Sequence, residues 1–241
     1  MALPKIDAPV YELDLPLSGK HIRFRPFLVK EQRNLFMALE SDDKETIEKN
    51  VRQVLHNCTL NEDVDIDALP ILDVEYYFIH LRARSVGEIV ENKYKCENLV
   101  DGKSCGHIMD SKFNLLEIKM DNLGSFNEPI QLTDKISVKL KYPEFSILER
   151  SGKFESASDM AFDMVVGSIE YIYDGSQFFY AAESTPAELI EFLESLSQEQ
   201  FSKIETFFNN LPKLNKTIEM KCSKCGFDHT IEVEGLNSFF G

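Results

Sequence analysis

Alternating apolar and polar positions open the chain. Residues 10–17 and 22–27 each follow this two-residue period, and the polar turn sequence Ser18-Gly19-Lys20 separates them. Two short alternating segments joined by such a turn are typical of a β-hairpin. Pro26 is placed to end the second strand, because it cannot donate to a strand ladder.

The spacing of apolar residues then changes to the period of a helix. Residues 28–39 and 47–58 each present apolar side chains on one helical face, and Asp42 or Asp43 is placed to cap the second helix. A third amphipathic helix is predicted over residues 73–84. The first third of the chain therefore combines a hairpin with helices.

Strand and helix patterns both occur in the rest of the chain. Alternation over residues 88–96, 108–119 and 135–142 predicts strands, and residues 156–173 have helical spacing. Two capping boxes, Thr185 to Glu188 and Ser197 to Gln200, mark the starts of two further helices. The inward positions of this helical pair are expected at Phe192, Leu193, Ile204, Phe207 and Phe208. The pattern as a whole indicates an α+β protein.

Composition and charge exclude several classes of function. With 43% hydrophobic residues the 241-residue chain can form a substantial core, and its apolar runs fall well short of the roughly 20 residues that span a bilayer. The N-terminal residues lack the pattern of a secretory signal, so the cytoplasm is the expected compartment. The net charge of −15 opposes binding to nucleic acid or to anionic lipid.

Four of the five cysteines occur in two similar fragments. Each fragment has a strand pattern, a cysteine, a loop and then a Cys-Gly pair, with cysteines at Cys96 and Cys105 in one and at Cys222 and Cys225 in the other. A glycine directly after the second cysteine permits the tight turn of a zinc knuckle. Four thiolates suit tetrahedral Zn²⁺ and leave no open position for catalysis. The sequence therefore predicts one structural Zn²⁺ site.

The two halves of this predicted site differ in how specific they are. The Cys222-x2-Cys225 spacing is typical of zinc, whereas the eight residues between Cys96 and Cys105 exceed the usual gap. The Asp101-Gly102 turn pair suggests a knuckle with an insertion. The alternatives are four buried, inert thiols, or His107 or His229 in place of one thiolate.

The remaining candidate residues give no indication of catalysis. Cys58 falls on the apolar face of its predicted helix, where a reduced cysteine usually packs. No glycine-rich phosphate loop, metal-binding His-Glu helix motif or nucleophile elbow is present, so the chain is predicted not to be an enzyme. The apolar C-terminal residues Phe239 and Phe240 are candidates for contact with a partner protein.

Several N-terminal segments resemble a known protein family. They are Met1 to Lys5 with Tyr11 to Leu13, Phe24 to Glu31, Met37 to Ser41, Asp73 to Tyr76 and Arg84 to Glu88. In these segments the chain resembles the baseplate proteins of T4-like bacteriophages, which include the baseplate hub subunit and the hub assembly protein. The resemblance implies a non-enzymatic role in building the contractile tail in the host cytoplasm, and it leaves open whether the protein stays in the virion. It implies other baseplate hub or tail proteins as partners.

The sequence thus predicts three regions and a function. Residues 1–85 form a hairpin and helical lobe, residues 86–120 with 214–241 form a zinc-ribbon lobe, and residues 121–213 are an inserted strand and helical segment. The predicted function is a structural or chaperone-like assembly protein of the baseplate hub. The alternative is a zinc-ribbon adaptor of a nucleic-acid-processing complex, which would usually present basic strands.

Overall fold

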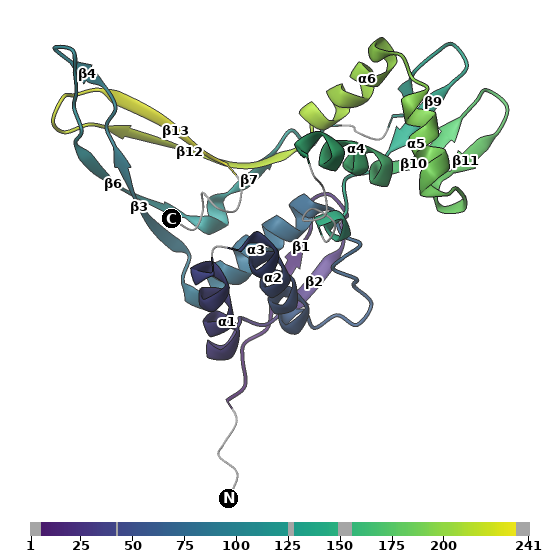
Figure 1. Cartoon of the computed structure of the whole chain (residues 1–241). Coiled ribbons are helices and arrows are strands. Elements are labelled where there is room, and N and C mark those ends of the chain that lie inside the picture. Colours follow the sequence, from purple (N-terminus) through teal and green to yellow (C-terminus); the bar gives the residue numbers. More distant parts are fainter. Residues whose placement is uncertain (1–5, 42, 125–127, 149–155, 235–241) are drawn as a thin grey trace, which may run out of the picture. The chain divides into compact units, whose positions relative to one another are not determined.

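The chain folds into two compact units that combine helices with small antiparallel sheets (Figure 1). Figure 1 shows a computed structural model, which describes residues 6–41, 43–124, 128–148 and 156–234. The first unit comprises residues 1–64, 72–121 and 213–241, and the second comprises residues 65–71 and 122–212. This architecture confirms the α+β class.

The first unit begins with the predicted hairpin and helices. Strands β1 (Tyr11–Asp14) and β2 (His21–Phe24) pair antiparallel, and α1 (Val29–Glu40), α2 (Lys44–Cys58) and α3 (Ile71–Val86) follow. The expected helix cap is Asp43, whose carboxylate accepts a hydrogen bond from the backbone N–H of Thr46 at 3.0 Å. The buried apolar residues of the hairpin and these helices include Ile22, Phe24, Leu55, Tyr77 and Leu81.

A buried carboxylate joins the hairpin turn to α3. Asp73 is fully buried and accepts hydrogen bonds from the backbone N–H groups of Leu17 (2.9 Å) and Ser18 (2.7 Å). A charged side chain can be buried at low cost only when such bonds replace its hydration. Asp73 therefore fixes the turn against the start of the helix.

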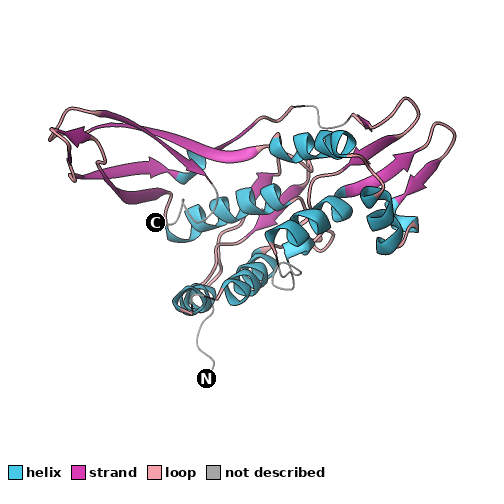
Figure 2. Ribbon diagram, turned by 45° about the horizontal axis from the view of Figure 1, so that its top comes forward, coloured by secondary structure: helices cyan, strands magenta, loops and turns pink. Residues whose placement is uncertain are grey.

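Two long hairpins extend from the rest of the first unit (Figure 2). Strand β3 (Ile89–Lys95) pairs with β6 (Ile108–Asn114), and β12 (Lys213–Lys221) pairs with β13 (Asp228–Glu234) and with β7 (Lys119–Asp121). Near the helices, one apolar cluster packs α3 against both hairpins. Its buried members are Ile79, Ala83, Val90, Phe113, Leu115, Ile118, Met120, Leu214, Ile218 and Val233.

The prediction of one continuous strand over residues 108–119 is wrong in one respect. It is broken into β6 and β7 by a short 3₁₀ turn, Leu115–Glu117 (η1). The Asn114 side chain accepts a hydrogen bond from the Leu116 N–H at 2.8 Å and so caps this turn. The interruption lets the chain leave the β3 hairpin and pair with β12.

The second unit packs three helices against one face of a four-stranded sheet. The sheet has the order β11 (Phe178–Tyr180), β10 (Ile169–Tyr173), β9 (Ser137–Leu140) and β8 (Ile130–Gln131). The helices are α4 (Ala157–Ser168), α5 (Pro186–Glu194) and α6 (Gln198–Asn209), and a short 3₁₀ turn, η3 (Ala181–Glu183), follows β11. Their core contains the predicted inward residues, with Leu193, Ile204 and Phe207 buried and Phe192 and Phe208 partly buried.

Both predicted capping boxes are present. The side chains of Thr185 and Ser197 accept hydrogen bonds from the N–H of Glu188 and Gln200, whose side chains accept in return from the cap N–H groups. The predicted helix over residues 156–173, however, ends at Ser168. Residues Ile169 to Tyr173 are β10 instead, because Ile169, Tyr171, Ile172 and Tyr173 pair with β9. Apolar residues four apart fit a helix, but β-branched and aromatic residues also favour a strand.

Within the part of the chain that the structure describes, no helix has both the length and the apolar character needed to cross a membrane.

Candidate metal centre

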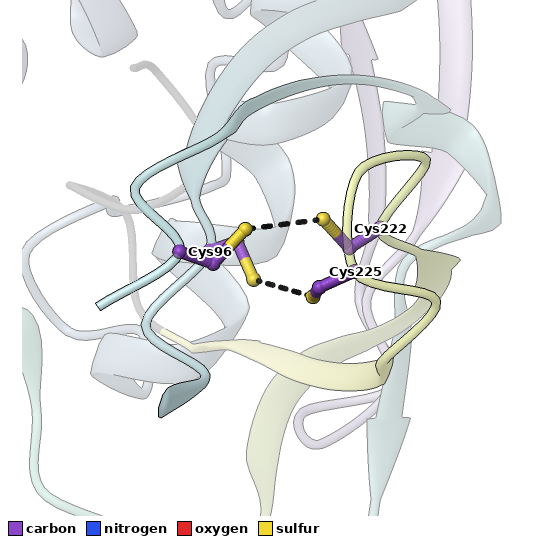
Figure 3. Close-up of side chains that lie close together, drawn as sticks. Cys96, Cys222 and Cys225 are labelled. Atoms are coloured by element: carbon purple, nitrogen blue, oxygen red, sulfur yellow. Dashed lines mark hydrogen bonds between the residues drawn. The ribbon is translucent and has the colours of Figure 1, made fainter. Parts of the chain in front are cut away.

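The four cysteines of the two predicted knuckles lie together at the ends of the long hairpins. The sulfur atoms of Cys96, Cys105, Cys222 and Cys225 all lie within 4.8 Å of one another. Cys96 follows β3 and Cys105 follows the short strand β5 (Lys103–Ser104), while Cys222 and Cys225 lie in the loop between β12 and β13. Figure 3 shows the two loops facing each other with the sulfurs between them.

Two backbone hydrogen bonds and a glycine turn close the first loop. The Cys96 N–H donates to the His107 carbonyl at 2.8 Å, and the Gly106 N–H donates to the Cys96 carbonyl at 3.0 Å. Gly106 has φ +65°, a left-handed conformation that glycine adopts without steric cost. These bonds turn the chain so that both thiols of the loop point inward.

The second loop repeats the same arrangement. The Cys222 N–H donates to the Phe227 carbonyl and the Gly226 N–H donates to the Cys222 carbonyl, both at 2.8 Å. Gly226 has φ +76°. Two loops from distant parts of the sequence therefore adopt one geometry, as their similar sequences predicted.

The long gap in the first loop is an inserted hairpin. Strands β4 (Leu99–Val100) and β5 pair antiparallel, and the turn residues Asp101 and Gly102 have φ of +51° and +76°. The Cys105 N–H donates to the Asn98 carbonyl at 2.8 Å, which closes the insertion next to the thiols. The predicted turn pair is confirmed, and the insertion leaves the hydrogen bonds between Cys96, Gly106 and His107 in place.

The sulfur spacing fits a tetrahedral metal ion. Cys96 and Cys225 have their sulfurs 3.6 Å apart, and those of Cys105 and Cys222 are 3.9 Å apart (Figure 3). Four sulfurs each about 2.3 Å from one Zn²⁺ ion in tetrahedral geometry would be separated by about 3.8 Å. The four cysteines therefore lie close enough together to hold a single metal ion.

Burial and hydrogen bonds give the thiols different acidities. Cys96 and Cys222 are fully buried, and burial raises the pKa of the Cys96 thiol to about 12. The backbone N–H of Phe227 lowers the pKa of the Cys225 thiol to about 6. A bound divalent cation would favour the thiolate form of all four cysteines.

Polar groups around the sulfurs complete the centre. His229 Nε2 lies 3.2 Å from Cys96 Sγ, and Asn98 Nδ2 donates to Cys225 Sγ at 3.6 Å. His107 lies further out, with Nε2 2.8 Å from Ser223 Oγ, and Lys224 Nζ donates to the Cys105 carbonyl at 2.9 Å. The compact sulfur group contains all four cysteines and neither histidine. Asn98 was not among the predicted site residues, because a single asparagine in a loop has no distinguishing pattern.

The other candidate residues lie elsewhere. Cys58 is fully buried at the end of α2, and burial raises the pKa of its thiol to about 11, which suits a packing role. Phe239 and Phe240 lie outside the described residues.

Comparison with known proteins gives one family and one relative. A model of the family described as "T4 bacteriophage base plate protein" matches residues 8–241. The chain is also similar to the baseplate hub assembly protein gp26 of Enterobacteria phage T4, with 26% identity over 232 residues. This match covers 95% of the chain and 97% of the relative. No solved structure matches.

Proposed function

The chain belongs to the T4 bacteriophage base plate protein family, and on this premise we propose that it is an assembly protein of the baseplate hub. The observation that carries the proposal is the alignment with a hub assembly protein over nearly the full length of both chains. Similarity confined to one module would support a shared fold alone, whereas similarity along both chains supports a shared role in the baseplate.

In this proposed role, the protein acts through contacts with other baseplate hub or tail proteins. It works in the host cytoplasm while the tail is being built, in a chaperone-like manner, and its role involves no catalysis. The large exposed apolar residues of the first unit support a binding role, among them Val29 (80% exposed) and Met37 (59%) on α1. Apolar side chains left in contact with water are common at protein interaction sites.

We further propose that Cys96, Cys105, Cys222 and Cys225 bind one structural Zn²⁺ ion. The sulfur distances, the paired knuckle hydrogen bonds and the positive φ at Gly106 and Gly226 all support this assignment. When bound, the ion would supply a four-point cross-link between the two long hairpins. The neighbouring groups Asn98 and His229 are placed to stabilise negative charge on the sulfurs.

The proposed organisation keeps the three predicted regions. Residues 1–85 are a hairpin and helical lobe, and residues 86–120 with 214–241 are a zinc-ribbon lobe. The segment 121–213 is an insertion. The separation of residues 122–212 into the second compact unit supports the insertion. The second unit also takes residues 65–71, whose backbone pairs with Pro143 and Phe145.

The alternative role, a zinc-ribbon adaptor of a nucleic-acid-processing complex, depends on the knuckles alone. The net charge of −15 opposes it, because contacts to phosphate require basic side chains. The family membership favours the baseplate role.

The proposed function is tested by removing the protein from an infection. A phage whose copy of this coding sequence carries a stop codon should produce heads but few assembled baseplates, and the intact protein supplied from a plasmid should restore tails. Electron microscopy and gradient sedimentation of the lysates measure both. Normal numbers of baseplates without the protein would contradict the proposal. Mass spectrometry of purified virions then decides whether the protein leaves after assembly.

A further inference from the structure

Strand β11 is an open edge made of exposed aromatic residues. It is the outermost strand of the sheet in the second unit (Figure 1), and its residues Phe178, Phe179 and Tyr180 are 52%, 42% and 47% exposed. Edge strands are usually protected by lysine, proline or a bulge, because an open edge can pair with another chain. None of these devices occurs in the Phe-Phe-Tyr sequence of β11.

Four aromatic rings form a continuous face across β10 and β11. Tyr171 pairs with Tyr180 and Tyr173 pairs with Phe178, so their side chains project from the same side of the hairpin. The ring centroids of Tyr173 and Phe178 are 4.7 Å apart, and those of Tyr171 and Phe178 are 5.2 Å apart. On the opposite side, Ile172 is buried under the helices. The aromatic face is therefore the side of the sheet that the helices leave uncovered.

The backbone of β11 also offers hydrogen-bonding groups at this edge. In an antiparallel pair, residues bonded to the partner strand alternate with residues whose N–H and C=O point away. The bond from the Asp174 N–H to the Gln177 carbonyl (3.3 Å) places Phe179 among the residues that face β10. Phe178 and Tyr180 then direct their N–H groups toward the open edge.

The charge around this edge is mostly negative. Residues 156–202 contain nine aspartates and glutamates and no lysine or arginine. Glu170 and Glu183 are exposed at one end of the hairpin, and Asp174 lies in the turn at the other. Two lysines lie nearby. Lys139 on β9 pairs with Tyr171, on the far side of β10 from the open edge, and Lys135 lies beside Gly175 in the turn between β10 and β11.

We propose that β11 and its aromatic face bind an extended, lysine- and arginine-bearing segment of a partner protein, which adds to the sheet as a further strand. Edge hydrogen bonds would give affinity, and the basic side chains would contact the aromatic rings and the surrounding carboxylates. A second copy of this chain, nucleic acid or anionic lipid would meet like charge. That this partner is a baseplate protein rests on the proposed function.

The absence of tryptophan from this chain makes a direct test possible. The probe is a synthetic peptide that alternates Lys or Arg with Val or Thr and carries one Trp, so that its fluorescence reports binding to the full-length protein. We expect saturable binding that weakens as salt is raised. A peptide of equal charge with proline at alternate positions cannot add as a strand and should bind roughly tenfold more weakly.

Variants of the protein locate the binding surface. Phe178→Ala with Tyr180→Ala leaves the charge unchanged and should weaken the strand-forming peptide roughly tenfold. The matched control is Phe36→Ala, which removes a similarly exposed ring (56%) from α1 and should leave binding unchanged. Should the double variant lose its thermal transition, Glu183→Lys provides a second test that keeps the rings and should also weaken binding.

Three results would overturn the inference. They are equal binding by the double variant and the intact protein, equal binding of the proline peptide, and a self-association in sedimentation velocity that the double variant abolishes. The last result would identify a second copy as the occupant. The peptide assay needs no other phage protein. A negative peptide result would reject only the binding edge, whereas normal baseplate assembly in the stop-codon infection would reject the proposed function.

Discussion

At the scale of single residues, the cysteine pattern carries most of the information about the candidate metal centre. Cys96 and Cys225 are 129 positions apart in the sequence, yet their sulfurs are 3.6 Å apart. The repeated pattern of a strand, a cysteine, a loop and a Cys-Gly pair predicted all four thiols from the sequence alone, because a metal-binding knuckle requires a specific local turn. Asn98 had no such local requirement, so only its place in the fold gives it a role.

Substitution of a clustered cysteine and substitution of Cys58 should have very different effects on the metal content. Cys222→Ser removes one of four proposed ligands and should reduce bound zinc from about one ion per chain to a small fraction, because a structural site loses affinity when its coordination is incomplete. Elemental analysis of the purified protein and its thermal midpoint measure the effect. Cys58→Ala, which alters a buried thiol outside the cluster, should retain the metal. Equal zinc in the two variants would refute the assignment.

The raised pKa of the Glu75 carboxyl group should make the free energy of unfolding depend on pH. Burial on α3 raises the pKa of Glu75 from an ordinary value of 4.5 to about 7. The folded state holds this proton more tightly than the unfolded state does. The group therefore favours folding below about pH 4.5, and that contribution is lost as the pH rises through about 7.

Replacement of Glu75 tests whether stability falls in this way as the pH rises. Glu75→Gln keeps the shape without the charge, so we expect it to stabilise the protein by about 2 kcal/mol at pH 8 and to have little effect near pH 4. Denaturant unfolding at both values measures the difference. Glu88→Gln, at an exposed position just after α3, is the control and should change neither value. A stabilisation that is the same at both pH values would show that charge burial is not the cause.

At the scale of elements, each knuckle depends on a glycine in a left-handed conformation. At Gly226 (φ +76°) an added Cβ would meet no atom within 4 Å, so the cost of a side chain there comes from the backbone conformation alone. We expect Gly226→Ala to destabilise the protein by about 1 kcal/mol. Gly226→Asn should recover part of that loss, because asparagine tolerates positive φ. Thermal unfolding of both variants checks the order, and Ala at least as stable as Asn would contradict it.

Helix and strand patterns were predictable to different degrees. The capping boxes at Thr185 and Ser197 specified both helix starts, since the reciprocal hydrogen bonds involve residues only three apart. The region from Ile169 to Tyr173 fitted a helix by its spacing but forms β10 through pairing with β9. Strand β11, only three residues long, had no periodicity from which to predict it.

At the scale of the whole molecule, the proposed cross-link belongs to one unit only. Removal of zinc with a chelator should accelerate amide hydrogen exchange in β3, β6, β12 and β13. We expect little change in α4 to α6, because their separate core in the second unit does not include the thiols. Hydrogen-exchange mass spectrometry with and without chelator measures both regions. Equal acceleration throughout the chain would show that the two units unfold as one.

The sequence by itself determined the α+β class, the four thiols, the inserted turn at Asp101 and Gly102 and the helix starts at Thr185 and Ser197. Each of these is set by interactions among residues close together in the chain or by ligand chemistry at fixed spacing. Tertiary structure decided the break between β6 and β7, the strand β10, the transfer of residues 65–71 to the second unit and the open aromatic edge at β11. These features depend on backbone pairing and burial between segments far apart in the sequence, which no local pattern specifies.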